Sequence, residues 1–233
     1  MNPFYLLVVT MVVALSTFVE AEKRPSIDIS ALLTQARQQQ LAQDTTWRKL
    51  LHFQDGASKS DVISEAFFYA ATGHKDPEAE LEATLAAFFD IPSDNVNTWA
   101  QCRFPARLMW LQDKLDWTGH PLPEVACKGF EKWSYDGKVD SLSLIFATGY
   151  LSNPASFYGH MLLKFNVPDH AKSGDLMDIS LNYGAGIPEN EDPISYIIRG
   201  IFGGYTAAFS HQKFYRFNHQ YANVELRDTW EYE

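Results

Sequence analysis

Residues 141–147 read Ser-Leu-Ser-Leu-Ile-Phe-Ala, and two comparable runs follow at 161–167 (Met-Leu-Leu-Lys-Phe-Asn-Val) and 176–183 (Leu-Met-Asp-Ile-Ser-Leu-Asn-Tyr). Short apolar runs with near alternation of apolar and polar residues, bounded by turn residues, are typical of β-strands. These three runs therefore predict a sheet in the second half of the chain.

The segments after these runs are less regular. Residues 193–199 (Pro-Ile-Ser-Tyr-Ile-Ile-Arg) predict a helix that stops at Gly200, and the aromatic run at 214–217 indicates a strand, with a further element starting within 224–232. Strands with interposed helices at this density predict an α+β fold.

The half that precedes the strands has its apolar residues at helical spacing. The clearest helix begins at Asp-Pro-Glu (76–78), where an acidic cap, a proline at the first helical position and a first-turn carboxylate coincide. It carries Leu81 and Leu85 on one face. We expect a helical module over residues 22–117, a Gly- and Pro-containing linker over 118–140 and a separate domain over 141–233.

The first residues have the pattern of a secretory signal. Phe4 to Val19 is an almost unbroken apolar run, and Val19-Glu20-Ala21 fits a cleavage site, so residues 1–21 predict a signal peptide. The alternative is an uncleaved amino-terminal membrane anchor, because the run is close to the lower limit for spanning a bilayer. Both interpretations place the rest of the chain outside the cytoplasm, in the periplasm.

Composition excludes several classes of protein. Across 233 residues, a hydrophobic content of 46% is enough to bury a core, and the formal net charge of -10 argues against nucleic acid as a partner. HExxH, CxxC, GxSxG and phosphate-binding glycine motifs do not occur in the sequence. We therefore expect no metal and no cofactor.

The chain has two cysteines, Cys102 and Cys127. In an exported protein the favoured interpretation is a disulfide between them, which would contribute roughly 3 kcal/mol to stability. The alternative is that one of them is a catalytic thiolate.

The candidate catalytic residues concentrate in the segment 152–163, which reads Ser-Asn-Pro-Ala-Ser-Phe-Tyr-Gly-His-Met-Leu-Leu. A glycine and then His160 stand at the mouth of an apolar strand, where an imidazole can act as a general base near neutral pH. Asn182, on the next predicted strand, is a candidate to orient that ring. The structural alternative is a strand-end histidine bonded to a neighbouring backbone carbonyl.

These residues resemble a known family. Asn153 to His160, Leu162-Leu163, Asn182-Tyr183, residues 200–205 and Arg-Asp-Thr-Trp-Glu-Tyr at 227–232 look like the Lnb N-terminal periplasmic domain family, long catalogued as a domain of unknown function. The region 47–115 is similar to the helical module that precedes that domain.

The resemblance implies a fold and an activity. The family resembles circularly permuted papain-like (NlpC-type) thiol enzymes, so it implies a partial papain-like antiparallel sheet domain after the helical module. Members linked to function are similar to lipoprotein N-acyltransferases, which implies a phospholipid or lipoprotein substrate. His160 matches the catalytic histidine and Asn182 the orienting amide, with Asn153, Ser156 and Tyr158 expected to bind substrate.

One departure from the family pattern affects the expected activity. The family's nucleophile lies in a Glu-Asn-Cys segment after the Trp-Glu-Tyr that matches residues 230–232, and this sequence stops at Glu233. We therefore expect a truncated or split thiol acyltransferase or amidase that is inactive without a complementing carboxyl-terminal chain. The alternative is a non-catalytic envelope module that binds lipid or peptidoglycan peptide.

Overall fold

The computed structural model describes residues 28–90, 95–152, 156–168 and 175–233. The chain folds into two compact units. The first contains residues up to Asp90 together with Ala106–Pro123, and the second contains Ile91–Pro105 and Glu124–Glu233. The expected signal peptide lies outside the described residues.

The first unit is helical. Its elements are α1 (Ser30–Gln38), η1 (Leu41–Gln43), α2 (Thr45–Leu50), η2 (Glu65–Phe67), α3 (Pro77–Phe88) and most of α5 (Pro105–Lys114). The helix predicted after Asp76 is confirmed: the Asp76 side chain accepts hydrogen bonds from the backbone N–H groups of Glu78 and Ala79. Trp47 is fully buried and stacks on Trp110 at a centroid distance of 5.7 Å.

A buried ion pair lies in the core of the first unit. Arg107 Nη1 donates to Glu80 Oε1 at 2.6 Å, and both side chains are almost inaccessible to solvent. Glu80 also accepts the backbone N–H groups of Tyr69 and Ala70. Buried charges are tolerated where they are paired and hydrogen-bonded in this way.

The second unit is built on a five-stranded antiparallel sheet with the order β4-β3-β2-β1-β5. The strands are β1 (Ser141–Ala147), β2 (His160–Asn166), β3 (Ile179–Ala185), β4 (Ala207–Lys213) and β5 (Thr229–Tyr232). The other elements are η3 (Val96–Thr98), α4 (Ala100–Arg103), α6 (Lys128–Trp133), η4 (Tyr135–Gly137), η7 (Asp175–Met177), α7 (Pro193–Phe202), α8 (Phe214–Asn218) and the π-helix η8 (His219–Val224). The predicted α+β fold, helical first and antiparallel-sheet second, is confirmed.

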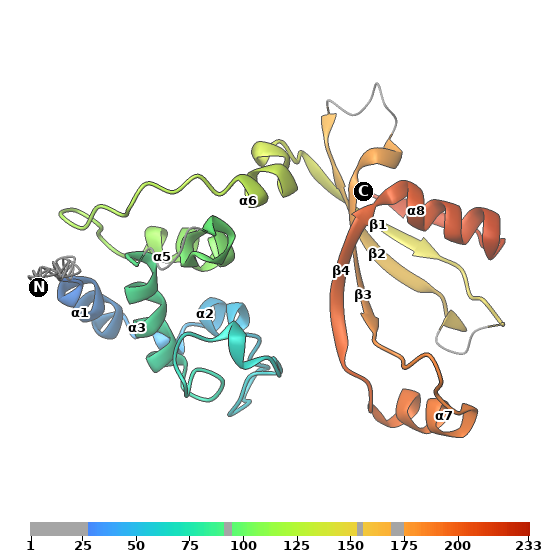
Figure 1. The fold of residues 1–233 in the computed structure, drawn as a ribbon, viewed down its shortest axis with the longest axis horizontal. Coiled ribbons are helices and arrows are strands. Elements are labelled where there is room, and N and C mark those ends of the chain that lie inside the picture. Colours follow the sequence, from blue (N-terminus) through green and yellow to red (C-terminus); the bar gives the residue numbers. More distant parts are fainter. Residues whose placement is uncertain (1–27, 91–94, 153–155, 169–174) are drawn as a thin grey trace, which may run out of the picture. The chain divides into compact units, whose positions relative to one another are not determined.

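α8 and η8 cover one face of this sheet (Figure 1). Phe214, Phe217 and Tyr221 form a buried cluster with side chains of β1 and β2, including Ile145 and Leu162. The strand predicted at 214–217 is wrong. Spacings of three and four residues place those three aromatic side chains on one side of a helix, where they pack on the sheet.

Candidate functional site

His160 is the first residue of β2 and lies opposite Ala147 of β1. Gly159 precedes it with φ +99°, a backbone conformation that residues other than glycine rarely adopt. A Cβ atom at Gly159 would lie 2.7 Å from both the Ala147 carbonyl oxygen and the Phe146 ring. The glycine therefore allows the chain to pass close to β1 immediately before the histidine.

The structure brings the two predicted catalytic residues together. Asn182 lies opposite Leu162, two residues along β2 from His160, so both side chains project from the same face of the sheet. His160 Nε2 and Asn182 Oδ1 form a hydrogen bond. In a neutral imidazole, donation from Nε2 to this amide oxygen would leave the lone pair on Nδ1.

Tyr221, Glu225 and Arg227 form a supporting group beside the imidazole. The Tyr221 ring lies 6.3 Å from the His160 ring, centroid to centroid. Arg227 is buried and donates to the backbone carbonyls of Thr148 at 2.5 Å and Ala147 at 3.1 Å, and to Glu225 Oε2 at 2.7 Å. Arg227 thus ties the end of β1 to the segment that follows η8.

These surroundings shift the pKa values of Tyr221 and Glu225. Burial raises the pKa of Tyr221 to about 12, with Glu225 adding to the shift and Arg227 opposing it. Burial also raises the pKa of the Glu225 carboxyl, but hydrogen bonds from Gln220 and Arg227 and the positive charge of Arg227 outweigh it, so that pKa lies below its ordinary value. The site therefore keeps a neutral phenol and an ionised carboxylate near the imidazole.

A cavity of about 370 Å³ lies beside His160 and Asn182. Its other lining residues come from the turn before β2, from β4 and from the α8–η8 region: Ser156, Gln212, Arg216, Phe217, Gln220, Tyr221, Glu225 and Arg227. A polar cavity next to a histidine can hold a reacting group and its nucleophile.

The three expected substrate-binding residues have different positions. Ser156 lines the His160 cavity. Tyr158 is 90% exposed and lines a separate, apolar pocket. Asn153 lies outside the described residues. Substrate binding by these residues stays a prediction.

Tyr221, Glu225 and Arg227 were not expected as site residues. Arg227 belongs to a string that resembles the family and Tyr221 to an aromatic stretch, but neither position has a local pattern that indicates a site. The only signal was a charged residue within the Arg-Asp-Thr-Trp-Glu-Tyr string at 227–232.

Cys102 and Cys127 form a disulfide, which confirms the favoured interpretation. Neither is therefore a catalytic thiolate. In the described ranges, no three His, Cys, Asp or Glu side chains are grouped as metal ligands would be. Within those same ranges, none of the helices has the length and apolar character needed to cross a bilayer.

Comparison with known proteins agrees with this architecture. Residues 39–114 match a domain of unknown function (DUF7843), and residues 129–233 match the Lnb N-terminal periplasmic domain. Searches of curated proteins and of solved structures gave no match. A match to a periplasmic domain suggests an exported envelope protein. Over residues 129–233, the chain is thus similar to the Lnb N-terminal periplasmic domain family.

Proposed function

We propose that the second unit is the base-bearing part of a cysteine-dependent acyltransferase, in which His160 is the general base and Asn182 holds its ring. The observation that carries this proposal is the hydrogen bond between His160 Nε2 and Asn182 Oδ1 beside the cavity. In a neutral ring this bond would leave Nδ1 as the basic nitrogen, which is the arrangement that a nucleophile-activating histidine requires.

The thiol comes from another polypeptide segment in this proposal, because both cysteines of the sequence are in the disulfide. His160 Nδ1 takes the thiol proton, and the thiolate attacks the carbonyl carbon of an acyl ester. The ester C–O bond breaks, the alcohol leaves with the proton and a thioester remains. An amine then attacks the thioester, which forms the amide and returns the thiol.

The resemblance supplies the substrates for this reaction: a phospholipid as acyl donor and the amino-terminal cysteine of a lipoprotein as acceptor. The chain alone is expected to be inactive, since no thioester can form without a thiol. A segment that carries a free cysteine would restore the reaction.

A second function is non-catalytic binding of lipid or peptidoglycan peptide in the envelope. It is favoured by the engagement of both cysteines in the disulfide and by the apolar pocket that Tyr158 lines. The two functions differ in whether His160 accelerates a reaction when a thiol is supplied.

The test uses 2-aminoethanethiol as the missing nucleophile and p-nitrophenyl octanoate as the acyl donor. We expect the purified protein to accelerate thiol-dependent release of nitrophenol. His160→Gln should lower that acceleration at least about tenfold. His219→Gln is the matched control, because His219 is an exposed histidine of the same unit that is hydrogen-bonded to Asn223.

Two further outcomes are informative. Equal rates of nitrophenol release by the native protein and His160→Gln would contradict the catalytic function and favour the binding function. Acyl transfer by the native protein without added thiol would contradict the proposal that the thiol comes from another segment. Because the added thiol can also reduce the disulfide, the assay is repeated with the double variant Cys102→Ser/Cys127→Ser.

A further inference from the structure

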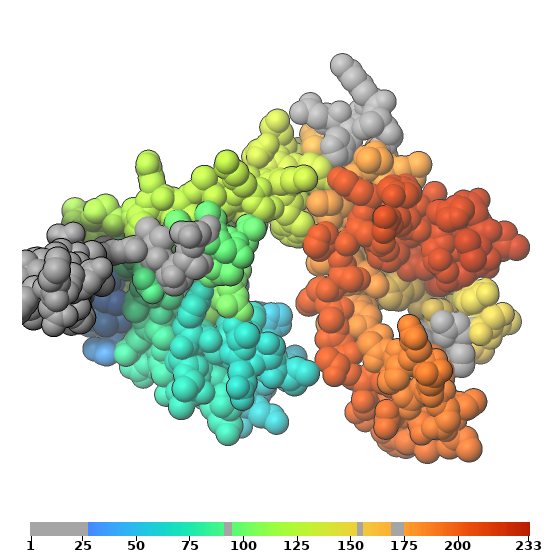
Figure 2. Space-filling model, in the orientation of Figure 1, coloured from blue at the N-terminus to red at the C-terminus, as the bar shows by residue number. Residues whose placement is uncertain are grey.

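β4 is an edge strand of the sheet. It pairs with β3 along seven consecutive residues, from Ala207 opposite Ala185 to Lys213 opposite Ile179, and no strand in the described part of the chain pairs with its outer side (Figure 1). Figure 2 shows the orange-red surface of β4 at the border of the second unit. The backbone groups on that outer side are therefore placed to pair with an added strand.

β4, all of whose residues are described, lacks the features that usually protect a sheet edge. Edge strands are commonly shortened, charged, or interrupted by a proline or a bulge. The other edge strand, β5, has four residues and carries Glu231. β4 reads Ala-Ala-Phe-Ser-His-Gln-Lys, with no proline, an unbroken register and no charged residue before Lys213. An extended peptide can pair with a strand of this kind.

A pocket of about 480 Å³ lies at the carboxyl-terminal end of this edge, lined by His211, Gln212 and Lys213. Consecutive side chains of a strand project from opposite faces of a sheet, so a pocket lined by three in a row reaches around the outer edge of β4. Trp133 of α6 forms another wall, and its ring packs against the rings of Phe165 at 5.6 Å and His211 at 6.4 Å. The pocket therefore lies where an added strand would run.

The pocket is basic. Three cations line it, Lys132, Lys213 and Arg216, and its described lining contains no carboxylate. The chain as a whole has the opposite balance, because its 29 Asp and Glu residues outnumber its 19 Lys and Arg residues. A local cluster of cations in an acidic protein attracts a negatively charged group, and charge-assisted hydrogen bonds would hold that group there.

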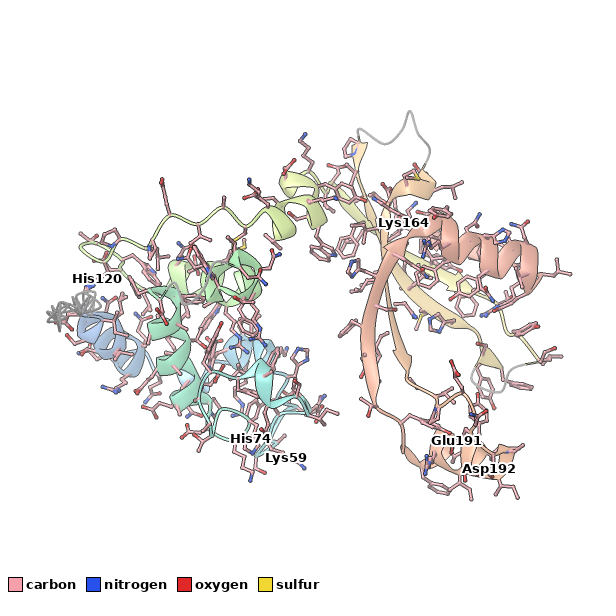
Figure 3. All side chains as sticks on the ribbon, viewed as in Figure 1. Lys59, His74, His120, Lys164, Glu191 and Asp192 are labelled. Carbon is pink, nitrogen blue, oxygen red and sulfur yellow. A yellow bond between two sulfur atoms is a disulfide. The ribbon has the colours of Figure 1, made fainter. Side chains whose placement is uncertain are left out.

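Tyrosine hydroxyls hold two of these cations without neutralising them. Lys213 Nζ donates to the Tyr135 hydroxyl at 2.8 Å, and Arg216 Nε donates to the hydroxyl of the preceding tyrosine at 3.2 Å. Neither cation is paired with a carboxylate of the described residues. Lys164, a buried cation of the same sheet that is labelled in Figure 3, differs because it pairs with Glu231 at 2.6 Å. The charges in the pocket thus remain available to a ligand.

We propose that β4 binds an extended acidic segment of a partner protein, which pairs with the strand edge and places a carboxylate in the basic pocket. Main-chain hydrogen bonds along β4 provide the pairing, and the pocket selects a glutamate or an aspartate at one position. A small anion would fill the pocket but leave the strand edge without a partner. A membrane surface would meet the cations but cannot pair with a strand. The surface depends on β4 and α6, and not on the proposed reaction of His160.

The test measures binding of three peptides to the full purified protein by isothermal titration calorimetry. The first is Thr-Val-Thr-Glu-Thr-Val-Thr, acetylated and amidated so that glutamate carries its only charge. The second has glutamine in place of glutamate, and we expect it to bind about five- to tenfold more weakly. The third is N-methylated at the four residues nearest the glutamate, which removes donors from both edges of the peptide. It should bind at least about tenfold more weakly.

Variants of α6 test the pocket. Lys132 and Lys128 are both exposed residues of this helix, but only Lys132 lines the pocket. Lys132→Gln should weaken the glutamate peptide about threefold and leave the glutamine peptide unchanged, since the expected ion pair is solvent-exposed. Lys128→Gln is the matched control and should leave both peptides unchanged. Equal weakening by the two variants would indicate a general attraction between charges and would overturn the pocket assignment.

Three other outcomes would overturn the proposal. Equal binding of the glutamate and glutamine peptides would show that the pocket does not select a carboxylate. Equal binding of the N-methylated peptide would contradict pairing with β4. Binding to phosphatidylglycerol vesicles that Lys132→Gln weakens, with no binding of the glutamate peptide, would assign the basic pocket to a membrane surface instead.

Discussion

The guanidinium carbon of Arg227 lies 4.7 Å from the centroid of the Tyr221 ring, and the same ring lies 6.3 Å from the His160 imidazole. The guanidinium also donates to the Thr148 and Ala147 carbonyls, and Ala147 is the β1 partner of His160. Arg227 therefore supports the histidine in two ways, through the Tyr221 ring and through the backbone of β1.

Replacing Arg227 should destabilise the second unit strongly. Arg227→Met removes the guanidinium donor from two backbone carbonyls and leaves the Glu225 carboxylate with Gln220 alone, which should lower the free energy of unfolding by about 3 kcal/mol. Urea unfolding followed by circular dichroism measures this loss. Arg216→Met is the control: Arg216 is exposed, and we expect a change within about 0.5 kcal/mol. Similar losses in the two variants would contradict the supporting role.

Tyr221 should make stability fall at high pH. Its pKa is raised from 10.0 to about 12, so the folded state favours the neutral phenol. The corresponding stability is fully present below pH 10 and is lost as the pH rises through 12. Tyrosinate absorbance against pH should show a late step that is smaller in Tyr221→Phe. The step should keep its full size in Tyr183→Phe, because Tyr183 is exposed. A late step of unchanged size in Tyr221→Phe would contradict the assignment to Tyr221.

Local sequence patterns predicted much of this fold. The run at 141–147 has the same bounds as β1, and the cap at Asp76-Pro77 marks the start of α3. Both depend on interactions within a few residues: alternation along a strand and a side chain bonded to the first helical turn. The His160–Asn182 pair could also be anticipated, because adjacent strands place matching positions on one face.

Features that depend on distant contacts were missed. β4 (Ala207–Lys213) has no clear apolar alternation, since most of its side chains are exposed, and it forms by pairing with β3. The aromatic residues at 214–217 favour a strand by type, but packing on the sheet selects a helix. The Arg227 bond to Ala147 spans 80 residues, so nothing near Arg227 in the sequence indicates it.

The Glu80–Arg107 pair should dominate the stability of the first unit. Glu80→Gln removes the charge that compensates a buried guanidinium, which should cost about 3 to 5 kcal/mol. Glu82→Gln is a matched control on the same helix, because Glu82 pairs with Arg37 at the surface, with side chains 33% and 55% exposed. That exposed pair should contribute less than about 1 kcal/mol. Thermal unfolding of both variants measures the two losses of stability. Comparable losses in Glu80→Gln and Glu82→Gln would contradict the prediction.

Removing the disulfide should lower stability by about 3 kcal/mol, because Cys102 and Cys127 are 25 positions apart and the bridge restricts the unfolded chain. Cys102→Ser/Cys127→Ser is compared with the oxidised native protein by urea unfolding. Alkylation followed by mass spectrometry should find no free thiol in the native protein before reduction. Two alkylated cysteines without reductant would contradict the bridge.

The disulfide also changes what a break in the backbone would do. Both cysteines belong to the second unit, whereas residues 106–123 between them belong to the first. Covalently, the chain is a closed ring with a tail at each end, and α5 is part of that ring. A protease that cuts once between Thr118 and Pro123 would therefore leave a single oxidised molecule. Only reduction would release two fragments, so the bridge keeps the chain in one piece after such a cut.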